Sequence, residues 1–345
     1  MIRAIVIDDS AFNRVTISRL LESSGEVKVV ATAADGESGI KQTLRHTPDV
    51  ITLDIEMPGI DGFGFLRWLM ANQPTPVIAV SSRADAQSVF KALELGAAEF
   101  IVKPGGPISP RLEEVREDLL AKVRAAHDVR LDNLAARMQA SGLPLAPQAE
   151  SGLKLLVDVV VIGASTGGPP ALQTLFQRTP RINVPFVVAQ HMPAVFTRLF
   201  AERVDRISSY TVKEGVDGER LRAATVYVAP GGMQTEVRRD GAGLMLDIYE
   251  PAEGDLYAPS VDRLFESASR ACAERVLAII LTGMGADGAE AIRTVRGRGG
   301  KTIAESAETA IIFGMPRGAI GTGAVQHVLP LHEITAAINR LCHEE

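Results

Sequence analysis

Cysteine is scarce in this sequence. Only Cys272 and Cys342 occur among 345 residues, and no cysteine pair has the spacing of a metal site. Two cysteines also cannot form the dense disulfide framework on which small secreted domains depend. We therefore interpret both residues as ordinary thiols of a protein in a reducing compartment.

Long apolar runs and a surplus of basic residues are also missing. No stretch is long and apolar enough to span a bilayer, and after Met1 the chain enters a predicted strand without a signal sequence. The formal net charge is -6, whereas nucleic-acid-binding proteins usually carry a basic stripe. We expect a cytoplasmic protein that neither inserts into membranes nor binds nucleic acid.

Hydrophobic residues make up 46% of the chain, which at this length suffices for two ordinary cores. In the first part, apolar runs alternate with amphipathic stretches. The predicted strands lie at residues 2–7, 27–31, 50–53, 77–80 and 100–102. Strands that alternate with helices form parallel sheets covered on both faces. We therefore predict a doubly wound α/β domain over residues 1–125.

Acidic, hydroxylated and basic residues cluster where these strands end. Asp8 and Asp9 follow the first strand, Asp54 the third, Ser81 the fourth and Lys103 the fifth. Open parallel sheets build their sites at these ends. Three carboxylates suit a hard cation such as Mg²⁺, and a lysine with a hydroxyl suits a phosphoryl group. Taken singly, a strand-end aspartate is often no more than a helix cap.

The sequence around these positions closely resembles the response-regulator receiver family, across about residues 1–125. The segments that carry the resemblance are Ile5–Ser10, Asp54–Gly62, Val80–Ser82 and Phe100–Pro104. The resemblance implies a flavodoxin-like fold in which Asp54 accepts a phosphoryl group from a histidine kinase of the CheA type. It also implies that Ser81 and Lys103 contact that group.

The same resemblance implies a metal site. Asp9, Asp54 and the backbone carbonyl of Glu56 would hold Mg²⁺, and Asp8 would support the ion through water. We therefore expect Mg²⁺ to be the cofactor of this domain during phosphorylation.

A long helix is predicted from about residue 110, because apolar residues recur there at helical spacing. The Ser-Gly-Leu-Pro-Leu-Ala-Pro segment at 141–147 would end any continuation of it. We place a linker at 126–153 and a second domain at 154–345.

The second domain is organised around Ser165. A β-branched run at 159–162 predicts a buried strand, and Ser165 follows it in a Gly-x-Ser-x-Gly elbow with Gly163 and Gly167. A predicted helix starts directly behind the serine, so free backbone N–H groups point at whatever the serine holds. The arrangement suits a phosphate or an oxyanion equally well, and many such turns are only structural.

Two further predicted strands end in candidate catalytic residues. Residues 185–190 precede His191, and residues 276–281 precede a glycine-rich turn that contains Asp287. If these strands neighbour that of Ser165, the three side chains can converge as a hydrolase triad. His191 would take the serine proton and Asp287 would orient the imidazole. Singly, they could be a core histidine and a turn aspartate.

These motifs resemble the chemotaxis protein-glutamate methylesterases over nearly the whole chain. The matching segments are Gly163–Gly168, Gln190–Pro193, Ala229–Gly232, Pro259–Asp262, Leu281–Gly288 and Phe313–Pro316. The resemblance implies that Ser165, His191 and Asp287 form the triad. It further implies that Met284 donates its backbone N–H to the oxyanion and that Thr166 helps to order the site.

Family members demethylate glutamates of chemoreceptors and deamidate certain receptor glutamines. The resemblance therefore implies methyl-accepting chemoreceptors as substrates and a location at receptor arrays. It implies a Rossmann-like catalytic domain without a cofactor, and we expect a monomer.

Two positions depart from the family pattern. Gln234 stands where we expect a histidine, and Glu305 stands where a glutamine is usual. Both lie outside the triad, and we expect them to alter the groove that receives the receptor helix.

Two other classes of function are less consistent with the sequence. A dinucleotide-binding sensor would show the G-x-G-x-x-G spacing and a carboxylate at the end of the next strand, where this chain has His191. A DNA-binding output would need a basic helix-turn-helix, which is not found here.

Overall fold

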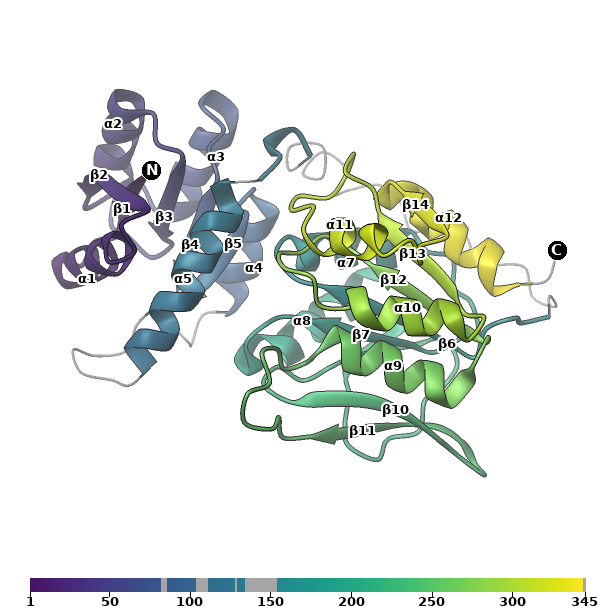
Figure 1. The fold of residues 1–345 in the computed structure, drawn as a ribbon. Helices are drawn as coiled ribbons and strands as arrows, with labels where there is room; N and C mark the ends of the chain where they lie inside the picture. Colours follow the sequence, from purple (N-terminus) through teal and green to yellow (C-terminus); the bar gives the residue numbers. More distant parts are fainter. Residues whose placement is uncertain (82–85, 104–110, 128, 134–153, 344–345) are drawn as a thin grey trace. The chain divides into compact units, whose positions relative to one another are not determined.

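The computed structural model describes residues 1–81, 86–103, 111–127, 129–133 and 154–343 (Figure 1). The chain divides into two compact units, residues 1–139 and 140–345, each built around its own parallel sheet. Most of the predicted linker, including the segment at 141–147, lies outside the described residues.

Strands and helices alternate through the described part of the first unit. In order they are β1 (Ile2–Ile7), α1 (Ala11–Glu22), β2 (Val27–Ala33), α2 (Gly36–His46), β3 (Val50–Asp54), α3 (Gly62–Asn72), β4 (Val77–Ser81), α4 (Ala86–Glu94), β5 (Glu99–Val102) and α5 (Arg111–His127). The strands pair in parallel in the order β2-β1-β3-β4-β5. The predicted doubly wound sheet is confirmed.

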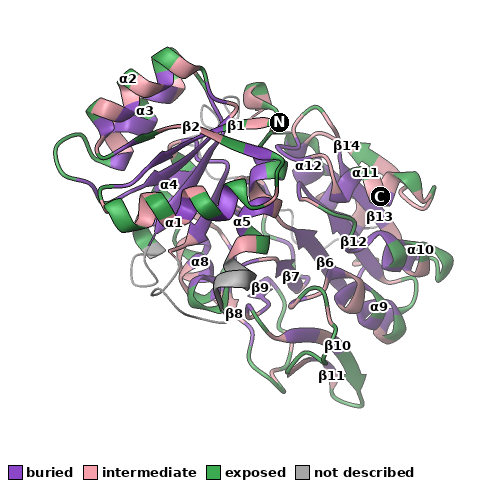
Figure 2. Cartoon of the chain, turned by 60° about the vertical axis from the view of Figure 1, so that its left-hand side comes forward, coloured by how far each residue is buried: buried purple, intermediate pink, exposed green. Residues whose placement is uncertain are grey.

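Helices cover both faces of this sheet. Helices α1 and α5 pack on one face, against residues such as Val6 and Val80, and α2, α3 and α4 pack on the other. Figure 2 shows that the strands carry the buried residues while the outer faces of the helices are exposed. The chain order reverses between β1 and β3, and open α/β sheets bind their ligands at such a reversal.

The second unit continues the alternation and adds a hairpin. Its elements are β6 (Val159–Ala164), α7 (Gly168–Arg178), β7 (Phe186–Gln190), α8 (Ala194–Ile207), β8 (Thr211–Glu214), β9 (Thr225–Val228), β10 (Gln234–Asp240), β11 (Gly243–Tyr249), α9 (Val261–Cys272), β12 (Val276–Ile280), α10 (Ala289–Gly297), β13 (Lys301–Glu305), α11 (Met315–Gly321), β14 (His327–Leu329) and α12 (Leu331–Cys342).

The strands of the second sheet are all parallel, in the order β14-β13-β12-β6-β7-β9-β8. Strand β6 therefore lies between β12 and β7, as the triad hypothesis requires. The sequence analysis did not anticipate the antiparallel hairpin of β10 and β11, which forms a separate small sheet.

Both faces of the second sheet are covered. Helices α9, α10 and α11 pack on one face, and the β10–β11 hairpin packs against α9. Helices α7, α8 and α12 lie on the other face, where the rings of Phe176, Phe186 and Tyr210 meet edge to face. Among the described residues, no helix combines the length and hydrophobicity that crossing a bilayer requires.

Gly163 at the end of β6 is needed because α9 lies directly against it. A Cβ added there would overlap the side chain of Val261, the first residue of α9. We therefore expect Gly163→Ala to lower stability by about 1–3 kcal/mol, the usual cost of overpacking a core. Thermal and urea unfolding would measure it.

Gly297→Ala is the matched control, since a Cβ at this last residue of α10 meets no atom within 4 Å. It should leave stability unchanged or raise it slightly. Equal unfolding midpoints for Gly163→Ala and wild type would contradict the packing argument.

Candidate phosphorylation and active sites

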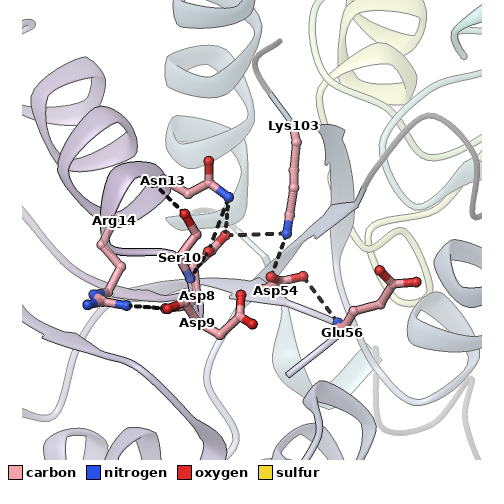
Figure 3. Close-up of polar contacts among 8 residues, drawn as sticks. All are labelled: Asp8, Asp9, Ser10, Asn13, Arg14, Asp54, Glu56 and Lys103. Carbon is pink, nitrogen blue, oxygen red and sulfur yellow. Dashed lines mark hydrogen bonds and ion pairs between the residues drawn. The ribbon is translucent and has the colours of Figure 1, made fainter. Parts of the chain in front are cut away.

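Three carboxylates meet at the carboxyl edge of the first sheet. Asp8 and Asp9 follow β1 and Asp54 ends the adjacent β3, and ligand oxygens of the three lie within 4.8 Å of one another (Figure 3). Asp8 and Asp54 are buried, whereas Asp9 is exposed. Oxygen donors of this kind suit a hard cation such as Mg²⁺, so the residues fit the ion expected from the sequence.

Lys103 is the cationic partner of this cluster. Its Nζ lies 2.5 Å from Asp54 Oδ2 and 3.6 Å from an oxygen of Asp8. Burial raises the pKa of the Asp54 carboxyl, and the nearby charge of Asp8 adds to the effect, although Lys103 acts against it. The other oxygen of Asp54 accepts the backbone N–H of Glu56 at 3.1 Å.

The first turn of α1 holds the two aspartates that follow β1. Asp8 accepts the backbone N–H of Ser10 and the side-chain amide of Asn13, and Arg14 donates to the carbonyls of Asp8 and Asp9. Asn13 and Arg14 were missed by the sequence analysis, because ordinary polar residues on a helix carry no motif. Asn13 holds the carboxylate of Asp8, and Arg14 holds the backbone of both aspartates.

Ser81 and Lys103 come from neighbouring strand ends. Ser81 ends β4 and pairs with Val102 of β5, and the backbone N–H of Lys103 donates to the carbonyl of Ser81 at 2.8 Å. The structure thus places both predicted phosphate-contacting residues at the edge that carries Asp54.

Neighbouring strands bring the candidate triad together in the second unit. Ser165 follows β6, His191 follows β7 and Asp287 lies in the turn after β12. The backbone N–H of Ser165 donates to the carbonyl of Thr282 at 3.1 Å, and that of His191 donates to the carbonyl of Ala164 at 3.0 Å. These hydrogen bonds extend the sheet pairing by one residue and align the loops that follow β6, β7 and β12.

Asp287 is the most heavily hydrogen-bonded residue of this group. Its carboxylate contacts His191 Nε2 at 2.9 Å and accepts the backbone N–H groups of Val261 and Asp262 and the hydroxyl of Ser260. The backbone donors lie in the first turn of α9, where a helix favours negative charge. Burial acts to raise the pKa of Asp287, but the bonds from His191, Val261 and Asp262 outweigh it and the pKa is lowered.

Ser165 is half-buried and follows β6, the strand between those that precede His191 and Asp287. Among the described residues, the structure contains no hydrogen bond to Ser165 Oγ, so the expected bond to His191 is not formed here. Catalytic hydrogen bonds often tighten only when substrate binds. Because Nε2 of His191 faces Asp287, Nδ1 is the nitrogen left to accept a proton.

Two backbone N–H groups are free to bind an oxyanion. Within the described part of the chain, neither Met284 nor Thr166 donates a backbone hydrogen bond. The Thr282 hydroxyl accepts the N–H of Ile312 at 3.0 Å and lies within hydrogen-bond distance of the Thr166 carbonyl, so it ties both turns together. The role expected for Thr166 stays a prediction, and Thr282 is a structural contributor that sequence reasoning missed.

The two departures from the family pattern lie in the interior. Gln234 and Glu305 are both fully buried, so an effect on the substrate groove would pass through the segments that they contact, and that effect stays a prediction. Glu305 accepts the backbone N–H of Thr282 at 2.8 Å and the hydroxyl of Thr309 at 2.9 Å. Glu305 thus hydrogen-bonds the turn that contains Thr282, and Gln234 hydrogen-bonds the segment at 255–260.

Comparisons with known proteins cover both units. The family model "CheB methylesterase" matches residues 160–338, and "Response regulator receiver domain" matches residues 4–109. A protein-glutamate methylesterase/protein-glutamine glutaminase of Myxococcus xanthus is 47% identical over 99% of this chain and 97% of its own length. One from Geobacter sulfurreducens is 42% identical over 99% and 97%.

A solved structure resembles the second unit. The CheB methylesterase catalytic domain of Thermotoga maritima is 36% identical, with a TM-score of 0.52, and the match covers 54% of this chain and 98% of that domain. Together with the full-length relatives, these matches show that the chain belongs to the CheB methylesterase family and carries a response-regulator receiver domain ahead of its methylesterase domain.

Proposed function

We propose that this chain is a phosphorylation-regulated serine hydrolase that demethylates glutamate γ-methyl esters of chemoreceptors and deamidates certain receptor glutamines. The observation that carries the proposal is the 2.9 Å contact between His191 and the buried Asp287, next to the elbow of Ser165. The full-length relatives named as methylesterases and glutaminases support the substrate class.

The arrangement supports acyl transfer in two steps. His191 takes the proton of Ser165 while Oγ attacks the ester carbonyl, and the resulting oxyanion is stabilised by the N–H groups of Met284 and Thr166. The imidazolium, stabilised by Asp287, returns the proton to the leaving methoxide, which departs as methanol. Water then attacks the acyl-enzyme, again with His191 as base, and glutamate is released. From a glutamine substrate, ammonia leaves instead.

The receiver supplies the regulatory step. Asp54 would accept the phosphoryl group from a histidine kinase of the CheA type, and Ser81 and Lys103 would bind its oxygens. Asp9, Asp54 and the carbonyl of Glu56 would hold Mg²⁺, and Asp8 would support the ion through water; the ion would neutralise phosphate charge during the transfer. Phosphorylation adds negative charge beside Lys103 and can shift the domain equilibrium by its differential free energy.

The organisation that we propose keeps the receiver at 1–125, a linker at 126–153 and the catalytic domain at 154–345. Both family-model matches fall inside the proposed domains. We further propose a monomer in the cytoplasm, associated with chemoreceptor arrays.

Ser165→Ala should abolish release of methanol from methyl-labelled receptor membranes while thermal unfolding stays nearly unchanged, because its hydroxyl makes no hydrogen bond to any residue that the structure describes. His191→Ala or Asp287→Ala added to it should cost no further activity, since residues that act as one unit are grossly non-additive. A Ser165→Ala variant with activity within tenfold of wild type would exclude this serine as nucleophile.

The pH dependence of kcat/KM tests whether His191 is the general base. The lowered pKa of Asp287 keeps that carboxylate ionised toward acid pH, so a fall of kcat/KM on the acid side should report the general base and not Asp287. The measurement is a pH–rate profile from about pH 5 to 8, the range in which histidines titrate. A flat profile would argue against His191 as the base.

A phosphoryl donor with Mg²⁺ should raise the esterase activity of the full chain, and Asp54→Asn should remove this response without changing basal activity.

A fragment that starts near residue 152 should be more active on receptors than the unphosphorylated full chain, if the receiver inhibits the catalytic domain. If the fragment proved no faster, inhibition by the receiver would be refuted, and Asp54 would have to act by recruitment or direct activation.

A further inference from the structure

An aromatic ring lies flat against the proposed base. The rings of Tyr257 and His191 are stacked, with centroids 4.6 Å apart and planes only 4° from parallel. The Tyr257 hydroxyl lies over Gly285, where an added Cβ would come within 2.9 Å of it. Tyr257 therefore contacts both the base and the turn that carries Met284, the proposed oxyanion donor.

This contact supplies a constraint that Asp287 alone cannot provide. One hydrogen bond at Nε2 fixes a single atom of the imidazole and leaves the ring plane free to tilt about that point. A parallel ring against its face restricts the tilt and so aims Nδ1, the nitrogen that must face Ser165. Misplacement of a reacting group by about 1 Å can cost on the order of 10²-fold in rate.

A buried amide holds the segment that carries Tyr257. The side-chain nitrogen of Gln234, in β10, donates to the carbonyl of Tyr257 at 2.8 Å and to Asp255 at 3.1 Å. Its oxygen accepts the backbone N–H of Ser260 at 3.0 Å, and the hydroxyl of Ser260 donates to Asp287. One side chain thus connects the hairpin to the supports of both His191 and Asp287.

The chemistry of the amide matters for this connection. Tyr257 and Asp255 present acceptors while Ser260 presents a donor, and only a side chain with two N–H donors and an acceptor satisfies all three. A carboxylate at this position would face two acceptors without a proton to donate. Gln234, which departs from the family pattern, is therefore well matched to its surroundings.

We propose that Tyr257 is a positioning residue that sets the plane of the His191 imidazole, and that Gln234 holds Tyr257 in that position. This inference rests on the proposed function, because it assigns His191 the role of base. It gives the β10–β11 hairpin, which lies outside the parallel sheet, a direct part in assembling the active site.

The kinetic test uses the full-length protein and p-nitrophenyl acetate, a small ester that needs no receptor groove. Tyr257→Leu should lower kcat by about 10- to 100-fold with KM changed less than about threefold. Tyr257→Phe keeps the aromatic ring and should retain most of the wild-type kcat. Leu256→Ala is the matched control, because Leu256 is the neighbouring residue and is 89% exposed. It should behave like wild type.

The second arm measures the contact itself. NMR spectra of histidine-labelled protein should show the ring protons of His191 shifted by the Tyr257 ring current, and the shift should persist in Tyr257→Phe and disappear in Tyr257→Leu. Gln234→Leu should reduce both the shift and kcat, with thermal unfolding recorded to verify folding. Loss of kcat in Tyr257→Leu together with loss of the ring-current shift supports the proposal.

Two results would overturn it: a Tyr257→Leu variant with kcat within twofold of wild type, or His191 resonances that do not respond to loss of the ring. Failure of the proposed function is distinguishable, because it would show as ester hydrolysis that survives Ser165→Ala. The NMR measurement does not depend on catalysis, so it would still test whether the Tyr257 ring lies against the His191 imidazole.

Discussion

The buried carboxylate of Asp287 is the group on which the rest of the catalytic site depends. A charge removed from water must be compensated by hydrogen bonds or by a partner charge. Asp287 obtains this compensation from the first turn of α9, from Ser260 and from His191. The same four contacts fix the histidine, the start of a helix and the glycine-rich turn. This arrangement of Asp287 and His191 therefore requires α9 to be packed against the sheet.

Each unit buries a carboxylate at the carboxyl edge of its parallel sheet and pairs it with a basic side chain. In each sheet the proposed reactive residue, Asp54 or Ser165, lies at the end of an inner strand, at the edge where open α/β sheets bind ligands. In the first unit a buried carboxylate is paired with Lys103, and in the second a buried carboxylate is paired with His191. A lysine keeps its charge and so suits the binding of phosphate, whereas a histidine changes its charge near neutral pH and so suits proton transfer.

Local pattern predicted most of the framework but little of what supports the site. The strands that precede Asp54, Ser165 and His191 are short apolar runs bounded by turn residues, which is a strong signal for a buried parallel strand. The β10–β11 hairpin gave no such signal, because its burial comes from α9 and its polar residues read as surface. The burial of Gln234 could not be predicted either, because the segment at 255–260 that covers it lies far away in the sequence.

The sequence by itself determined the class of fold, the family and the two sets of candidate site residues, because strand-end motifs depend only on neighbouring residues. Tertiary structure alone decided that β12, β6 and β7 are adjacent, that Nε2 of His191 faces Asp287, and that Tyr257 lies flat on the imidazole. The physical reason is that these contacts join segments far apart in the chain: 26 residues separate the paired positions of β6 and β7, 66 separate His191 from Tyr257, 96 separate His191 from Asp287, and 117 separate the paired positions of β6 and β12. No local propensity encodes such a pairing, and only the packing of helices on the shared sheet selects it.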